Sequence, residues 1–362
     1  MNKSHYIIPI FVPHEGCPHS CVFCNQNSIT GSKAKVDSQF AKATVQQYLE
    51  TIPKDNSIIE VSFFGGSFTA INIEKQSELL AVAKEYKDLG LINYIRLSTR
   101  PDYIDHHILS NLKFYGVDII ELGVQSLDKE VLQKSSRGHD EEDVIKASNL
   151  IKEYGITLGH QIMLGLPGDT FEKDIETAKK IIQMGPEICR IYPALVIKDT
   201  PMELLYNSGA YRPYTLEEGI DIAKIIYGMF KVNNINVIRI GLQPTDEIAE
   251  GKSIVAGPFH PAFRELVEGS LFNELIINEV PAEYSRELTI RVNSRDISKL
   301  YAYKKKFFID MKKQLKTISV NVIQDDAIKR ENIVLQMVEK TKKLSIYEYL
   351  LKKHKEGYCE FL

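Results

Sequence analysis

The sequence predicts an α/β fold: a closed or partly closed (β/α) barrel of the TIM type, followed by a small α/β domain. Two observations favour this class. Short β-rich runs alternate with amphipathic helical stretches over the first two thirds of the chain, and the pattern changes from about residue 275. A doubly wound open sheet would give a similar order of elements. Both architectures place active groups in the loops after the carboxyl ends of the strands.

The expected strands are short runs rich in β-branched and aromatic residues, bounded by turn-forming or polar residues. The stretches between them have the apolar periodicity of helices that cover a sheet. In chain order we predict strands at residues 6–12, 58–64, 94–98, 118–123, 157–163, 188–192 and 236–240, and helices near residues 38–52, 74–89, 103–115, 140–154, 170–184 and 215–232.

The last quarter of the chain is expected to form a separate small α/β domain. Strands are predicted at residues 287–293 and 317–323, with a helix at 298–316 between them and a second long helix from about residue 325. We therefore divide the chain into residues 1–274 and 275–362. The Gly- and Pro-containing stretch 243–263 is expected to lie over the barrel mouth, where Arg239 and His260 either face a substrate or serve the fold.

Composition excludes several classes of protein. The 362 residues carry a formal net charge of -3, which argues against a generally basic nucleic-acid coat. No secretory leader pattern is present, and no apolar run approaches the roughly 18 residues of a membrane span. We therefore expect a cytoplasmic protein. Its five cysteines do not look like a disulfide framework, so they are expected to be thiols available to a metal.

Three of the five cysteines crowd into the segment GCPHSCVFC after the first predicted strand. Cys17, Cys21 and Cys24 have the spacing C-x3-C-x2-C, with Phe23 before the last one. Zinc would need a fourth ligand from His14, His19 or a distant residue. A disulfide with one free thiol is the other ordinary alternative. The spacing matches an iron–sulfur ligation run more closely, with one iron left without a protein thiolate.

This cysteine run resembles the signature of the radical S-adenosylmethionine (radical SAM) enzymes. The resemblance implies a partial TIM-like (β/α)6 barrel in which the three cysteines hold a [4Fe-4S] cluster. S-adenosylmethionine would chelate the open iron, and an electron from the cluster would cleave it to a 5′-deoxyadenosyl radical. An electron donor such as flavodoxin or ferredoxin is implied as a partner.

Later strand ends supply further residues for S-adenosylmethionine. In the resemblance, FFGGSFT receives the methionine amino group, although an ordinary glycine turn would look the same. Arg137 is suited to the methionine carboxylate, and Glu121 and Gln125 can bind hydroxyls or an ammonium group. For Glu121 a structural ion pair is the alternative, and His160 is expected in the core. The predicted cofactor-binding set is Phe23, Gly65, Gly66, Ser67, Ser98, Glu121, Gln125, Arg137, Gln161 and Val196.

Several runs narrow the resemblance to the elongator catalytic subunit, a tRNA wobble-uridine modifying enzyme. These are ELGVQS followed by RGH, and IYPALVIKDTPM; GVQS and GLPG also occur in the oxygen-independent coproporphyrinogen oxidases. The chain departs from the elongator pattern by a shorter gap between the first two cysteines and by the lack of an acetyl-CoA-binding glycine signature after residue 245. Ser98 and Gln161 stand where relatives have acidic residues, and these two departures concern the contacts with ribose.

The stretch 291–316 is strongly basic, with nine Lys or Arg against two Asp. An ordinary solvent-exposed helix face would also be rich in lysine, but a concentrated basic patch suits contacts with RNA phosphates. The expected contacts are Lys304, Lys305, Lys306, Lys312 and Lys313. Cys189 and Cys359 are expected to be ordinary thiols. We therefore predict a radical SAM enzyme that modifies RNA, with tRNA as the expected substrate; the alternatives are a porphyrin-related radical SAM protein and a zinc-stabilised RNA-binding module.

Overall fold

The computed structural model of the chain describes residues 4–12, 17, 19–25, 36–53, 55–245, 248–249 and 251–357. His14 and Cys359, both considered above, lie outside the described residues. Among the described helices, none combines the length and the apolar character that crossing a membrane would require.

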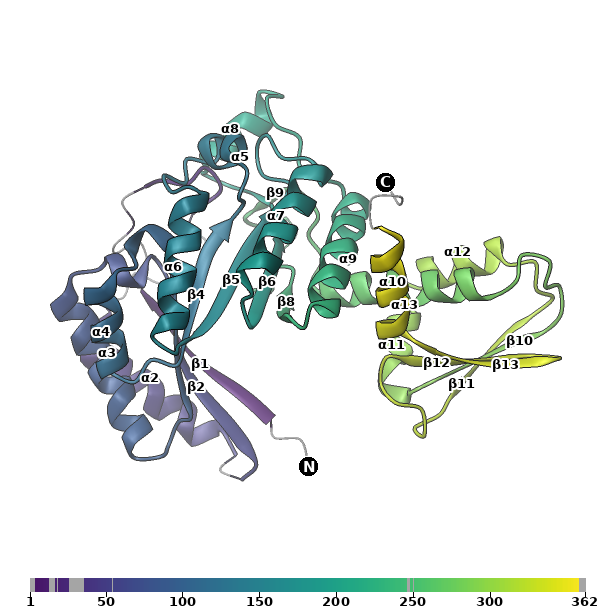
Figure 1. Cartoon of the computed structure of the whole chain (residues 1–362), viewed down its shortest axis with the longest axis horizontal. Coiled ribbons are helices and arrows are strands. Elements are labelled where there is room, and N and C mark those ends of the chain that lie inside the picture. Colours follow the sequence, from purple (N-terminus) through teal and green to yellow (C-terminus); the bar gives the residue numbers. More distant parts are fainter. Residues whose placement is uncertain are drawn as a thin grey trace.

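A parallel sheet curled into a half-barrel forms the larger part of the described chain (Figure 1). Its strand order follows the sequence from β1 to β6, and β8 extends it beyond β6. The predicted partial (β/α) barrel is therefore confirmed, and all seven strands predicted for this part of the chain are present. The strands are β1 (Ser4–Val12), β2 (Ser57–Gly65), β3 (Tyr94–Thr99), β4 (Ile119–Gln125), β5 (Thr157–Leu164), β6 (Ile188–Pro193) and β8 (Asn236–Ile240).

Helices between the strands cover the outer face of this sheet (Figure 1). Several begin at residues whose side chains cap the first turn, such as Asp37, Asn72 and Asp105. Capping boxes at Asp140 and Thr215 fix the starts of α6 and α9. The helices are α2 (Ser38–Thr51), α3 (Ile73–Asp88), α4 (His106–Phe114), α5 (Lys129–Lys134), α6 (Glu141–Glu153), α7 (Phe171–Met184), α8 (Pro201–Asn207) and α9 (Leu216–Val232), with short 3₁₀ turns η1 (Phe68–Ala70) and η2 (Pro101–Tyr103).

The two faces of the sheet differ in chemistry. Side chains that point outward, such as Ile8, Val61 and Ile95, are fully buried and form one continuous apolar core with the helices. Alternate residues on the same strands point inward, and there Glu60 and Arg96 are also almost fully buried. A buried charge is costly unless it is paired, so the inner face needs its own polar network.

The chain after β8 forms a second, four-stranded sheet with the order β11-β10-β12-β13. The predicted boundary at residue 274 falls within α10, which packs against α9 on one side and α11 and α12 on the other, so the domain division stays a prediction. The short strand β7 (Val196–Ile197), which precedes β8, pairs with β9 (Ile254–Ala256). The elements after β9 are α10 (Phe263–Glu279), β10 (Leu288–Val292), η3 (Ser294–Asp296), α11 (Ile297–Leu300), α12 (Lys306–Gln314), β11 (Val320–Gln324), β12 (Asn332–Met337), β13 (Lys340–Ser345) and α13 (Ile346–Glu356).

Two expectations for this region were wrong. The single helix predicted at residues 298–316 is broken, because Tyr303, Lys304 and Lys305 all have positive φ angles. These residues form a left-handed turn between α11 and α12, which a right-handed helix cannot include. The long helix predicted from residue 325 is instead the hairpin of β12 and β13 followed by α13. Alternation along NIVLQM, with Ile333, Leu335 and Met337 buried, has the period of a strand.

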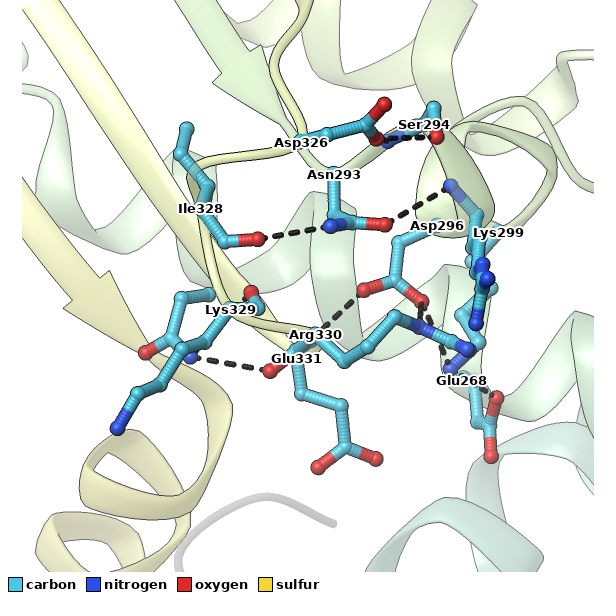
Figure 2. A network of polar contacts seen from close by, with 12 residues as sticks. Glu268, Asn293, Ser294, Asp296, Lys299, Asp326, Ile328, Lys329, Arg330 and Glu331 are labelled. Carbon is cyan, nitrogen blue, oxygen red and sulfur yellow. Dashed lines mark hydrogen bonds and ion pairs between the residues drawn. The ribbon is translucent and has the colours of Figure 1, made fainter. Parts of the chain in front are cut away.

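A polar network around Asp296 joins the second sheet to α10 (Figure 2). Asp296 is fully buried, and its carboxylate accepts hydrogen bonds from Arg330 Nε at 2.7 Å and from the Glu331 amide at 2.7 Å. Lys299 lies 3.3 Å from the same carboxylate and 2.9 Å from Glu268 of α10. Asp296 and Lys299 therefore link the loop between β11 and β12 to α10.

Candidate active site

The cysteine loop follows β1 at the carboxyl edge of the sheet, where the active groups were predicted. Its described part is anchored by backbone hydrogen bonds on two sides. The Val22 amide donates to the Ser135 carbonyl at 3.2 Å, and the Met202 amide of α8 donates to the Val22 carbonyl at 2.9 Å. Within the loop, the Cys24 amide donates to the Cys21 carbonyl at 3.0 Å. The loop is therefore held by segments that are far apart in the sequence.

In the described part of the chain, Cys17, Cys21 and Cys24 form no disulfide bond. In the described part of the chain no three His, Cys, Asp or Glu side chains are grouped as metal ligands, so the thiols share one loop but are not drawn together here. Their neighbours nevertheless suit thiolate ligands: Arg137 Nη1 donates to Cys21 Sγ at 3.3 Å, and Cys17 Sγ lies 3.7 Å from Ser67 Oγ. An all-thiol donor set beside a cation fits an iron–sulfur cluster.

The glycine turn after β2 closes directly against the end of β1. Gly65 has a φ of 109°, and a Cβ atom there would lie 2.7 Å from the Val12 carbonyl oxygen. The Gly66 amide donates to that same oxygen at 2.8 Å. Any side chain at residue 65 would break this contact, which brings buried Ser67 next to Cys17. The turn and the cysteine loop thus form one edge of the site.

An apolar cluster lies under the cysteine loop. Val22 is buried in it with Leu166, from the turn after β5, and with Val196 of β7; Phe23 packs against the same cluster. The backbone of Val196 pairs with Ala256 of β9, so this predicted cofactor-binding residue is held by part of the segment 243–263. Phe23 and Val196, predicted separately, are therefore brought together.

The end of β4 carries a bulge that sequence reasoning missed. The register with β5 shifts between Gly123 and Gln125, and Gln125 has a left-handed φ of 67°. Arg137 Nη2 donates to the Gly123 carbonyl, and His139 Nε2 lies 3.2 Å from the Val124 carbonyl. Bulges and left-handed residues are enriched at functional sites because they redirect side chains.

The bulge brings two predicted residues together, since Gln161 Nε2 donates to Gln125 Oε1 at 3.3 Å. It also identifies His139 as a residue that supports the site. Burial and the neighbouring charges of Arg137 and Arg100 lower the pKa of His139 to about 3, so its imidazole is neutral. The run RGH, named above for the family resemblance, contains this histidine two residues after Arg137, and that closeness in the sequence was the available signal.

Two family profiles match consecutive parts of the chain. The Radical SAM superfamily matches residues 11–181, which include the cysteine loop, the glycine turn and the β4 bulge. The Radical_SAM C-terminal domain matches residues 186–273.

The chain belongs to the radical SAM superfamily of enzymes.

Its similarity to individual proteins is consistent with the predicted elongator-like branch. The tRNA uridine(34) acetyltransferase of Methanocaldococcus jannaschii is 29% identical over 256 residues, which cover 60% of this chain and 47% of that protein. Elongator complex protein 3 of Bos taurus is 28% identical over 260 residues, covering 59% and 47%. The chain thus spans about half the length of the curated relatives it matches.

A solved structure supports the fold. The archaeal Methanocaldococcus infernus Elp3 with an N-terminal deletion superposes with a TM-score of 0.60 at 24% identity, covering 76% of this chain and 64% of that one. At this level of sequence identity, the similarity supports the fold of this radical SAM chain and nothing more specific.

On the inner face of the radical SAM sheet, Glu121 lies in ion pairs. It contacts Arg96 on one side, and its Oε2 is 2.7 Å from Arg190 Nε on the other. Half-buried Ser98 is aligned with Glu121 on the neighbouring strand. Glu121 therefore forms structural ion pairs, which was the alternative to a cofactor contact. Its contact with S-adenosylmethionine stays a prediction.

The five predicted RNA-contacting lysines do not share one helix face. Lys304 and Lys305 lie exposed in the left-handed turn, with Lys305 Nζ 4.7 Å from the centre of the Tyr301 ring. Lys306 and Lys313 both pair with Asp310, at 3.3 and 3.6 Å, and Lys312 is exposed in the last turn of α12. Their contact with RNA stays a prediction.

Proposed function

We propose that this radical SAM enzyme cleaves S-adenosylmethionine reductively and uses the product to modify an RNA, with tRNA as the substrate. The observation that carries the proposal is the anchored cysteine loop at the carboxyl edge of the half-barrel, next to the Gly65 turn and Arg137. The names of the relatives support tRNA: two of them are a tRNA uridine(34) acetyltransferase and an elongator complex protein. Because only part of each relative is matched, acetyl transfer is not included.

Cys17, Cys21 and Cys24 would hold a [4Fe-4S] cluster. When bound, the cluster supplies one electron that breaks a carbon–sulfur bond of S-adenosylmethionine and releases a 5′-deoxyadenosyl radical. Arg137, which donates to Cys21 and Gly123, would fix the loop against β4, and its charge suits a carboxylate nearby. The Gly65 turn would let backbone groups approach the amino acid part, and the cluster of Val22 and Leu166 would exclude water.

The setting of the enzyme follows from this chemistry. A cluster held by thiolates and a one-electron reaction suit the reducing cytoplasm. The electron would come from a small protein donor such as flavodoxin or ferredoxin. Free Cys189 is fully buried and its pKa is raised by burial, so it is not part of the ligand set.

Anaerobic reconstitution with iron and sulfide tests the proposal. The reduced protein is incubated with S-adenosylmethionine and total tRNA, and we expect 5′-deoxyadenosine together with a nucleoside of new mass. Cys17→Ala, Cys21→Ala and Cys24→Ala should each lose the iron and the product, whereas the matched variant Cys189→Ala should retain both. Zinc in place of iron and sulfide, or no 5′-deoxyadenosine from the wild type, would contradict the proposal.

A further inference from the structure

A row of alternating charges crosses the inner face of the half-barrel. Arg96 of β3 donates to both oxygens of Glu60 on β2, from Nε at 2.6 Å and from Nη2 at 2.9 Å, and its Nη1 contacts Glu121 on β4. Arg190 of β6 continues the row at 2.7 Å from Glu121. All four side chains are nearly buried. The row therefore connects Arg190 of β6 to charged side chains on β4, β3 and β2.

The row ends with excess positive charge at β6 and β8. Arg239 of β8 is aligned with Arg190 in the parallel ladder, so both side chains leave the same face of the sheet. Arg239 is half-buried, and within the described residues its guanidinium makes no hydrogen bond or ion pair. Arg190 shares Glu121 with Arg96, so this end of the row has two guanidinium groups and only part of one carboxylate. A half-buried cation without a partner indicates a missing anion.

Two aromatic rings face this charge from the opposite edge of the sheet. Phe11 of β1 is aligned with Phe64 of β2, and their ring centres are 6.0 Å apart. Phe11 keeps 40% of its surface exposed, although it lies on the inner side of the half-barrel. The guanidinium carbon of Arg190 lies 5.5 Å from the centre of the Phe64 ring, so side chains of β2 and β6 approach each other across the inner face of the curled sheet. Phe64 directly precedes the Gly65 turn, and the rings are thus next to the candidate cofactor site.

The chemistry of this face matches one nucleotide. Exposed aromatic rings stack flat bases, guanidinium groups donate to carbonyl oxygens on a base edge, and an unpaired guanidinium binds phosphate. We propose that Phe11 and Phe64 stack one carbonyl-bearing base of the RNA substrate, that Arg190 donates to its carbonyl oxygen, and that Arg239 binds the adjoining phosphate. The proposal rests on the proposed function and assigns the substrate position within the same site. An unstacked nucleotide is required, because the base must leave its neighbours to reach the inner face.

Equilibrium binding of labelled oligouridylate to the iron-loaded full chain tests this, measured by fluorescence anisotropy at several salt concentrations. Arg239→Gln should weaken binding about tenfold and lower the salt slope by about one. Phe11→Leu should weaken binding about tenfold without changing the slope, because stacking is lost and no charge is removed. Oligoadenylate, whose base has no carbonyl, should bind the wild type more weakly than oligouridylate does.

Matched variants separate these effects from general damage. Arg286→Gln and Phe114→Leu remove an exposed cation and an exposed ring far from the half-barrel interior, and both should bind oligouridylate like the wild type. If Phe11→Leu does not fold, Phe11→Tyr, which keeps the ring, should bind normally, and Arg239→Lys should keep most of the salt slope. Wild-type affinity and slope in Arg239→Gln and Phe11→Leu would overturn the proposal, as would failure of the wild type to bind. Since binding needs no turnover, a wild type that binds RNA but releases no 5′-deoxyadenosine would contradict the proposed function alone.

Discussion

At the scale of single residues, the site depends on backbone carbonyls that are held in unusual positions. At the bulge at the end of β4, Gln125 has a left-handed backbone conformation. Arg137 and His139, from the loop before α6, bind the carbonyls of Gly123 and Val124. Left-handed backbone costs free energy at a residue other than glycine, so the surrounding contacts must maintain it. His139 makes one of these contacts and does not belong to the predicted cofactor-binding set.

We therefore expect His139 to act as a positioning residue. In His139→Leu the Val124 carbonyl loses one donor, which should lower the free energy of unfolding by about 1 kcal/mol. If the bulge relaxes, S-adenosylmethionine binding should weaken about fivefold, and His139→Gln, which keeps a donor, should restore it. Urea unfolding and equilibrium dialysis measure the two effects. The exposed His107→Leu is the control, and destabilisation without weaker binding would limit His139 to a structural role.

A buried carboxyl pair gives the turn after β5 a pH dependence. Burial raises the pKa of Asp169 to about 6, and burial together with the charge of Asp169 raises the pKa of Asp174 well above its usual value. The Tyr214 hydroxyl donates to Asp174 Oδ2 at 2.9 Å. The folded pair thus binds protons more tightly than the unfolded chain, so its contribution to stability is present at low pH and is lost as the pH rises through about 6.

Asp174→Asn removes one of the two charges and should flatten this dependence. Between about pH 5 and about pH 8 the wild-type melting temperature should fall by a few degrees more than that of Asp174→Asn. Differential scanning calorimetry across this range measures it. Asp310→Asn, a partly exposed carboxylate in surface ion pairs, should keep the wild-type pH profile. Parallel profiles for wild type and Asp174→Asn would show that the pair is not coupled to folding.

At the scale of elements, the strands of the half-barrel could be read from the sequence and the second sheet could not. Runs such as IIEVSFF are rich in β-forming residues throughout, because paired charges cover the inner face of the strand and helices cover its outer face. The predicted ends of these strands therefore lie within about two residues of the observed ends. The turn at Tyr303–Lys305 was missed because lysines give no left-handed signal, unlike glycine. The hairpin from Asn332 to Ser345 was missed because KTKKLS is polar and lies at a sheet edge.

The left-handed turn makes a prediction for α12. Lys305 has a φ of 68° and precedes the first turn without a capping side chain. Lys305→Gly should raise the free energy of unfolding by about 0.5 to 1 kcal/mol, since glycine adopts this conformation freely and the lost contact with Tyr301 offsets only part of the gain. Lys306→Gly removes the same charge from within the helix and should lower it by about 1 kcal/mol. Chemical denaturation compares them, and equal effects would contradict the argument.

The cysteine loop could be predicted from the sequence because of its chemistry. Three thiols in eight residues are a pattern that folding alone does not require, whereas Glu60, Arg96 and Arg190 are scattered over three strands and resemble ordinary surface charges in the sequence. Only the inward direction of alternate strand residues brings them into one row. Contacts of this kind depend on register, which a single sequence does not reveal.

At the scale of the whole molecule, a half-buried ion-pair cluster joins the half-barrel to the last helix. Glu274 of α10 lies 2.7 Å from Lys224 of α9 and 2.8 Å from Lys353 of α13, and it accepts from the Tyr349 hydroxyl at 2.7 Å. Burial opposes ionisation of Glu274, but the two lysines and Tyr349 outweigh it and lower its pKa to about 2. The cluster therefore stabilises the fold above about pH 4.5, and this contribution is lost as the pH falls toward 2.

Glu274→Gln removes the carboxylate that Lys224 and Lys353 share, while Lys224 keeps Asp221 at 3.4 Å. Because the side chain is partly exposed, we expect a loss of about 2 kcal/mol at neutral pH, less than for a fully buried pair. The difference from the wild type should shrink below about pH 4, where the wild-type carboxylate also begins to be protonated. Urea unfolding at the two pH values measures both effects. Glu176→Gln, an exposed partner of Lys179, should cost little, and a pH-independent difference would count against the ionic explanation.

The anchoring of the cysteine loop has a consequence for biosynthesis. The loop is near the amino terminus, yet its contacts come from Ser67, Ser135, Arg137 and Met202. Ser67, Ser135 and Arg137 lie in the first half of the chain, but Met202 lies in the second half, so the Val22 carbonyl cannot be anchored until α8 has been synthesised. We therefore expect a nascent chain arrested before α8 to retain iron less well than the same chain extended through that helix.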